Sequence, residues 1–156
     1  MANFKSPYAD GQRQAPISGG AEAVAVRAEI AVTTALASAD ILEAMELPED
    51  HVPVDFMVDA DDLDDGTDLT LSVGVLNDDK DDISTVTADG GAAWMVDSTV
   101  GQAGGIVRPT TKTVTRVTPS STTRRMLGLK VTAASTDANA GVVGLTVWLR
   151  ASHGGA

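Results

Sequence analysis

The strict alternation of apolar and polar side chains along residues 23–33 constrains the fold of this chain more than any other feature. The side chains that fall on one side are all apolar, and those on the other side include charged ones: Val24, Val26, Ala28, Ile30 and Val32 against Ala25, Arg27, Glu29, Ala31 and Thr33. A period of two sustained over such a length is typical of a β-strand with one face in the core and the other in solvent. The alternation therefore predicts a half-buried strand.

The same pattern recurs in four later segments of the chain. Their predicted inward-facing residues are Val54, Phe56 and Val58, then Leu69, Leu71, Val73 and Val75, then Leu127, Leu129, Val131 and Ala133, and finally Val143, Leu145, Val147 and Leu149. The Thr- and Val-rich segment 106–117 is also predicted to be strand. Because proline has no N–H to donate, Pro109 confines the early part of that segment to a sheet edge or a bulge.

Two further segments are less regular. The segment 40–47 could open a short helix through a capping box or could be a strand, and we favour the strand. The segment 89–102 favours one or two helical turns, capped by Asp89 and ended by Gly101 or by the pair at 104–105.

Seven to eight short strands, Asp- and Gly-rich turns and a short helix predict a single all-β domain. A jelly roll is the commonest way to pack that many strands while hiding most of their edges, so we expect a jelly-roll-like antiparallel β-sandwich. We assign this sandwich domain to residues 21–150 and a flexible C-terminal tail to residues 151–156.

Residues 1–20 mix proline, glycine and single polar or aromatic residues and show neither period. Such a segment does not bury enough apolar surface to order itself, so it is predicted to be an extended N-terminal arm. Two interpretations stay open. The arm is either a frayed terminus, or a segment that becomes ordered on a neighbouring subunit through Phe4, Tyr8 and Ile17.

The charge of the chain excludes several kinds of partner and site. The 156 residues include 22 acidic and 11 basic ones, and aromatic residues make up 3% of the chain, so we expect no nucleic-acid partner. No apolar stretch approaches the ~20 residues that cross a bilayer, so we expect no membrane contact. The chain contains no cysteine, which excludes disulfides and thiolate metal sites.

The acidic run over residues 59–68 is the most conspicuous candidate site. Calcium binds carboxylate oxygens, so the weak metal-ligand candidates are Asp59, Asp61, Asp62 and Asp64. The run does not fit an EF-hand loop, because Leu63 stands where an oxygen ligand is required and no glutamate closes the loop. Solvated turns that keep strand edges from aggregating are the favoured interpretation, and no cofactor is expected.

No catalytic motif is present. The sequence has no nucleophile elbow, P-loop or dinucleotide fingerprint, and His51 and His153 are predicted to be exposed loop residues, so we expect no catalytic residue. The candidate contact residues are instead basic or aromatic. The basic ones are Arg108, Lys112, Arg116, Arg124 and Arg125, and Trp148 joins them because it lies on the outward side of its predicted strand.

The order of short segments resembles the decoration (cement) proteins of tailed-bacteriophage capsids over roughly residues 22–150. The segments that carry the resemblance are Asp40-Ile41-Leu42 leading to Leu47-Pro48, Asp62-Leu63-Asp64, Val73-Gly74-Val75-Leu76, Gln102-Ala103-Gly104-Gly105 before Val107-Arg108, and Leu145-Thr146-Val147-Trp148-Leu149-Arg150.

This resemblance implies a non-enzymatic virion structural protein on the capsid surface. Such a protein binds the outside of a phage head, stabilises contacts between major capsid proteins, and forms a homodimer or homotrimer. The arm and the basic residues named above are then expected to make the contacts. The alternative is a carbohydrate- or calcium-binding β-sandwich module of a phage tail or fibre, since acidic loops on sandwich domains can hold a cation.

Overall fold

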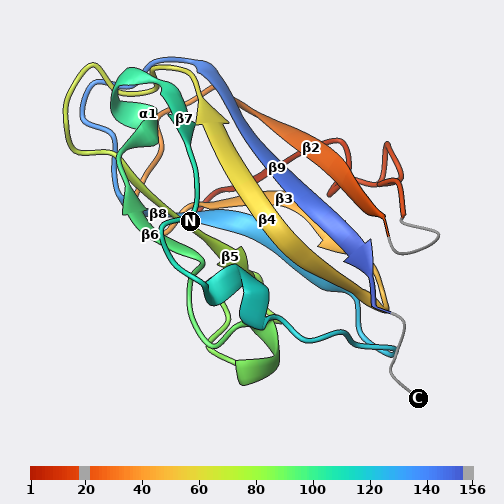
Figure 1. The fold of residues 1–156 in the computed structure, drawn as a ribbon. Helices are drawn as coiled ribbons and strands as arrows, with labels where there is room; N and C mark the ends of the chain where they lie inside the picture. The colour runs from red at the N-terminus through yellow and green to blue at the C-terminus, as the bar shows by residue number, and fades with distance from the viewer. Residues whose placement is uncertain (18–21, 153–156) are drawn as a thin grey trace.

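Nine strands form two stacked sheets in the computed structural model of the chain, which describes residues 1–17 and 22–152. The strands are β1 (Asn3–Lys5), β2 (Ala23–Val32), β3 (Ile41–Leu47), β4 (His51–Ala60), β5 (Thr70–Val75), β6 (Met95–Ser98), β7 (Gly105–Val107), β8 (Arg125–Ala133) and β9 (Gly141–Ala151). One sheet has the order β2-β9-β4-β7 and the other the order β1-β3-β8-β5-β6 (Figure 1).

The strands β2 to β9 are nested antiparallel pairs. β2 pairs with β9, β3 with β8, β4 with β7 and β5 with β6, so a long hairpin is rolled up with its first and last strands side by side. This nesting, with partners divided between two sheets, is the jelly-roll topology. The prediction of an all-β, jelly-roll-like antiparallel sandwich is confirmed, and β1 adds a ninth strand beyond the seven or eight expected.

The core lies between the two sheets and follows the predicted alternation. In β2 the residues from Val26 to Val32 alternate between buried and exposed, and the predicted inward-facing residues of β9 are fully buried. The aromatic centre of the core is Phe56 of β4 against Trp94, with ring centroids 5.6 Å apart. Burial of these apolar faces supplies most of the driving force for stacking the sheets.

The outer faces of the two sheets differ in what covers them. The face of the five-stranded sheet carries a second small apolar cluster of Ile41, Leu76 and Met126, packed against Ala9 of the arm and Ile83. β5 is therefore buried on both sides. On the outward side of β2, in the four-stranded sheet, the side chains remain exposed. The jelly roll thus presents one largely uncovered sheet face.

The segment 40–47 contains the strand β3, so the favoured prediction is confirmed. The prediction of a strand over 106–117 is correct only for its first residues. β7 ends at Val107 as a short edge strand, and the chain then turns into a 3-10 helix, η2 (Thr113–Arg116). Threonine side chains stabilise the turn by bonding nearby backbone, since the Thr115 hydroxyl donates to Lys112 O at 2.7 Å. This competition with sheet hydrogen bonds is typical of threonine.

The helix predicted over 89–102 is shorter than expected and lies later. A 3-10 helix, η1 (Thr87–Asp89), precedes the strand β6, and α1 (Val100–Ala103) is the single α-helical turn in the described residues, followed by the predicted glycine pair. Asp89 does not cap a helix. Its carboxylate accepts hydrogen bonds from the Ser84 hydroxyl at 2.6 Å and the Arg125 guanidinium at 3.1 Å. Pairing with β5 therefore overrides the local helical preference of this segment.

One residue predicted to face the core points outward. The pairing of β4 with β9 shifts register between Pro53 and Asp55, and this β-bulge turns Val54 to the surface, where it is 37% exposed. A bulge places two residues of one strand opposite one of the partner strand, so side chains before and after it change sides.

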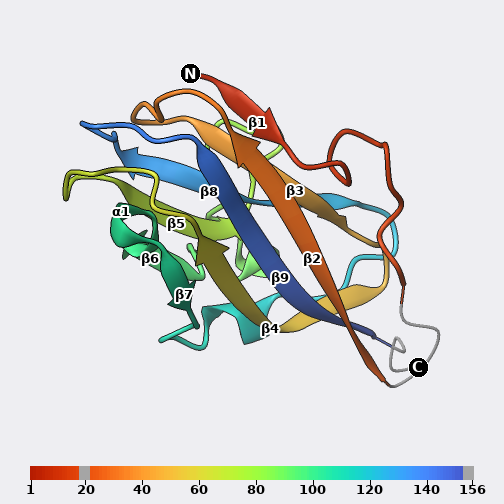
Figure 2. The same cartoon turned by 90° about the horizontal axis from the view of Figure 1, so that it is seen from above.

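The described part of the arm, residues 1–17, lies along one edge of its own sandwich. β1 runs parallel to β3, the Ala2 N–H donates to Asp40 Oδ1 at 2.6 Å, and Ser6 is buried with its hydroxyl donating to the Ala44 carbonyl. Figure 2 shows the arm, in red, beside β2 and β3. In the described part of the chain no helix is long and apolar enough to cross a membrane.

Candidate protein–protein interface

The uncovered face of the four-stranded sheet gathers aromatic, aliphatic and charged side chains. Trp148 of β9 lies opposite Ala25 of β2 and Asp55 of β4 in the sheet register. The guanidinium of Arg108 sits over the Trp148 ring, 5.5 Å from its centroid, and pairs with Asp55 at 3.0 Å. Ile106 of β7, which is 68% exposed, lies on the same face. Such a mixed surface suits contact with another protein.

Arg125 is committed to contacts within its own chain. Its side chain is 9% exposed, and it donates to Asp89 Oδ1 at 3.1 Å, to Ala88 O at 3.1 Å and to Thr118 O at 2.9 Å. These bonds hold η1 and the segment after η2 against β8. Because the guanidinium is largely buried and multiply bonded, it is a structural clamp.

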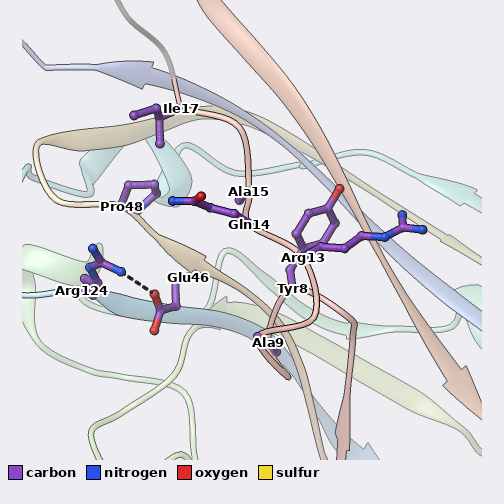
Figure 3. A pocket seen from close by; sticks show the side chains of 10 residues that line it. Tyr8, Ala9, Arg13, Gln14, Ala15, Ile17, Glu46, Pro48 and Arg124 are labelled. Carbon is purple, nitrogen blue, oxygen red and sulfur yellow. Dashed lines mark hydrogen bonds and ion pairs between the residues drawn. The ribbon is translucent and has the colours of Figure 1, made fainter.

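Arg124 lies at the rim of a hollow beneath the arm. The guanidinium is exposed and pairs with Glu46 at 3.3 Å and with Glu49 at 3.8 Å. Figure 3 shows this rim together with Tyr8 and Ile17, two of the predicted anchors. The hollow has a volume of 290 Å³. Phe4, the third anchor, is half-buried against the core of its own chain.

Lys112 and Arg116 are the predicted basic residues that keep a free charge. Both are exposed on or beside η2, and within residues 1–17 and 22–152 neither takes part in an ion pair. Arg150, at the end of β9, is a third exposed cation without an acidic partner in that part of the chain, and it lines a 310 Å³ hollow with Thr115 of η2. Sequence analysis missed Arg150, although it continues the outward series that contains Trp148.

Each of the four metal-ligand candidates forms a hydrogen bond or ion pair with another group of the chain, and Asp64 is described below. Asp59 pairs with Arg27 at 2.5 Å, Asp61 accepts the Val142 N–H at 2.8 Å, and Asp62 accepts the N–H of Asp64 at 3.3 Å. Over the described ranges there is no group of three or more His, Cys, Asp or Glu side chains placed to hold a metal ion.

Asp64 is the centre of the acidic loops and is fully buried. Its two carboxylate oxygens accept backbone N–H groups from both loops at this end of the sandwich, those of Gly66, Asp68, Leu69, Thr136 and Asp137, at 3.0 to 3.3 Å. These hydrogen bonds, the one from Asp137 first, lower the pKa of Asp64 because they stabilise the charged carboxylate. Asp64 therefore fastens the loop after β4 to the loop after β8.

His51 is not an exposed loop residue. It is the first residue of β4, it is buried, and its Nδ1 lies 2.8 Å from the Glu49 carbonyl. The proline at position 53 did not prevent the strand from starting here, because the bulge that follows accommodates it. His153 lies outside the described residues.

Comparison with known proteins places the chain among phage capsid components. No protein-family model and no curated protein matches the sequence. A chain in the solved capsid of Ralstonia phage GP4 is 32% identical, with 96% of this chain and 97% of that chain aligned and a TM-score of 0.81. A chain of the cyanophage Pam1 capsid asymmetric unit shares the fold at 20% identity and a TM-score of 0.59, over 88% of this chain and 92% of that one. The chain therefore belongs to the family of virion structural proteins represented in the Ralstonia phage GP4 capsid.

Proposed function

We propose that this protein is a non-enzymatic decoration (cement) protein that binds the outside of a phage head and stabilises contacts between major capsid proteins. The observation that carries the proposal is the alignment over nearly the full length with a chain of the Ralstonia phage GP4 capsid. The surface position and the capsid partner come from the resemblance of its sequence to decoration proteins.

The surface of the molecule suits this role. The chain exposes 7400 Å², so a standard interface of about 800 Å² per partner would use roughly a tenth of it. The uncovered sheet face and the two hollows beside η2 and the arm offer concave and flat surfaces of mixed polarity. The net charge of −11 disfavours non-specific aggregation of the free protein, so docking depends on a patch of opposite charge or apolar character.

The proposed contacts fall into three groups. Lys112 and Arg116 come first, because their charges have no partner in the described chain. The arm residues Phe4, Tyr8 and Ile17 and the outward residues Arg108 and Trp148 are a second group. The third group is Arg124 and Arg125, which would need to leave or share their ion pairs within the chain, so their contribution to binding is expected to be smaller.

Uptake by capsids tests the proposal directly. Purified protein mixed with expanded, undecorated heads should bind in a fixed stoichiometry and raise the temperature at which the heads rupture, since each bound copy stabilises the closed shell. Absence of uptake at every salt concentration would contradict the proposal.

Charge variants then locate the docking patch. Neutralising both cations near η2, as Lys112→Gln with Arg116→Gln, should weaken uptake and make it less sensitive to salt. The matched control is Lys80→Gln with Lys130→Gln, which removes the same charge from two lysines paired with Glu43 and Asp82 elsewhere on the surface. Equal losses for the two double variants would show that η2 is not part of the interface.

A further inference from the structure

The four sheet edges of the sandwich differ in length. Three edge strands are short: β1 and β7 have 3 residues each and β6 has 4. The fourth, β2, has 10 residues and pairs with β9 over its whole length without a bulge. Short edge strands and bulges are two of the means by which proteins prevent pairing with other chains, and β2 has neither, so it is the edge with the greatest capacity for further pairing.

The free edge of β2 is not used within the described chain. β2 pairs with β9 alone, and none of the turn and loop backbone hydrogen bonds in the described ranges involves its residues. β1 belongs to the opposite sheet, where it pairs with β3. A row of backbone donors and acceptors along one side of β2 therefore faces outward and can receive a further strand.

The sequence of β2 is self-complementary in the antiparallel direction. Around Ala28 at the centre, Arg27 mirrors Glu29 and Val26 mirrors Ile30, and the outer positions repeat as Ala25 with Ala31 and Val24 with Val32. Two copies paired in this register would place each Arg27 directly opposite Glu29 of the second copy. The buried residues of both copies would stay on one face of the joined sheet, because the register pairs even with even positions.

The arm leaves open space beside the C-terminal half of β2. A hollow of 420 Å³ lies between the arm and β2, and its walls include Asp10, Glu29 and Ala31. In the self-paired register this is where Ala25 and Arg27 of the second copy would lie. The carboxylates of Glu29 and Asp10 would then meet the incoming guanidinium, beside the two arm cations Lys5 and Arg13. To make this contact, Arg27 would share the ion pairs that it forms with Asp59 and Glu29 in its own chain. The small alanines at the exposed positions allow two backbones to approach without side-chain collision.

We propose that two copies of this chain associate through antiparallel pairing of their β2 strands, centred on Ala28, so that the two four-stranded sheets become one continuous sheet. Such a contact is isologous, since the same strand is used on both sides of a two-fold axis, and it closes at the dimer. The inference concerns the chain itself and does not depend on where in the virion it binds.

Engineered cysteines test the register. The chain has no cysteine of its own, so the double variant Ala25→Cys/Ala31→Cys carries the only two thiols. Within one chain these positions are about 20 Å apart along the strand, too far for a disulfide. In the proposed register, position 25 of each copy lies opposite position 31 of the other copy, so two disulfides can form across the dimer. Mild oxidation should give a covalent dimer of the double variant on non-reducing electrophoresis, whereas each single variant should stay monomeric on the gel. Equal cross-linking of the single variants would overturn the register.

Sedimentation across a concentration series tests the association itself. The wild-type chain should approach twice its 16.0 kDa mass as concentration rises. Glu29→Lys places a lysine opposite Arg27 on both sides of the two-fold axis and should raise the dissociation constant about tenfold or more. Asp55→Lys is the matched control, since it makes the same charge change on the same sheet face but on β4, away from the edge. A wild-type chain that remains monomeric, or a dimer lost in Asp55→Lys but not in Glu29→Lys, would refute strand pairing.

Discussion

Replacing Gly128 with alanine tests how tightly the covered face of the five-stranded sheet is packed. Gly128 lies in β8, opposite Glu43 of β3 and Gly74 of β5. A Cβ at this position would lie 2.6 Å from the Leu42 carbonyl oxygen and 2.9 Å from Leu76 Cδ1, whereas ordinary contacts begin at 3.4 Å. The nearer atom belongs to the backbone of the neighbouring strand, so relief requires the two strands to move apart.

The expected cost follows from that geometry. Overpacking a well-packed site costs about 1–3 kcal/mol, and for a domain of this size each kcal/mol corresponds to about 2–4 °C in Tm. Gly128→Ala should therefore unfold about 2–12 °C below the wild type in calorimetry. Gly144→Ala is the control, because the atoms nearest to its Cβ would belong to the side chains of Arg27 and Asp59, the former at 2.6 Å, on the uncovered face.

Those side chains can swing away at the loss of a partly exposed ion pair on the sheet surface, which is worth about 1 kcal/mol. Gly144→Ala should therefore lower Tm by no more than a few degrees. A Tm for Gly128→Ala equal to that of the wild type, or a larger loss for Gly144→Ala than for Gly128→Ala, would refute this reasoning.

Three other predictions follow from the interior and the acidic loops. Asp64→Asn should unfold at a lower temperature than the wild type at neutral pH. The pKa of Asp64 is lower in the folded state than its unfolded-state value of about 3.9, so the charged carboxylate stabilises the fold above that pH and this stabilisation is lost as pH falls through the folded-state pKa. The difference in Tm between the variant and the wild type should therefore shrink in acid. A Tm difference that does not change with pH would contradict this. Phe56→Ala, which empties the contact with Trp94, should cost about 3–5 kcal/mol in urea unfolding, and a loss near zero would show that the ring is not packed as described. Calcium should leave the Tm unchanged, since the described acidic side chains form no group placed to hold a metal ion, and a rise with calcium concentration would contradict that prediction.

The strands could be predicted from the sequence wherever one face of the strand is exposed to solvent. The alternation in β2 and β9 reports burial on one side, and both strands occur where it predicts them. β5 was also identified, although Ser72 and Gly74 on its other side are buried beneath the segment that follows it. The alternation revealed the strand but not the layer that covers it, because that layer is formed by irregular loop residues.

The errors arose where local preference and tertiary pairing disagree. Residues 95–98 join β5 as an edge strand although their surroundings favour a helical turn, and the threonines after Val107 bond their own backbone instead of a neighbouring strand. Val54 changed sides at a bulge, a feature with no signal in the alternation.

The candidate site could be predicted only by residue type. Charge and position identified the basic residues, but sequence could not show that Arg125 is buried against Asp89 while Lys112 and Arg116 remain free. In the same way the acidic run was interpreted as solvated turns, with a cation site as the weaker alternative. Only the three-dimensional arrangement shows that Asp64 accepts backbone N–H groups from a loop about 70 residues further along. These roles depend on long-range contacts.

Electron cryo-microscopy of intact virions, with the copy number of this chain measured by quantitative mass spectrometry of the same particles, tests the central claim most directly. We expect this jelly roll on the outer surface of the head, in a fixed number of copies, seated across boundaries between major capsid proteins. Particles whose heads lack it on the outside, with the chain confined to the tail or absent, would contradict the assignment as a decoration protein.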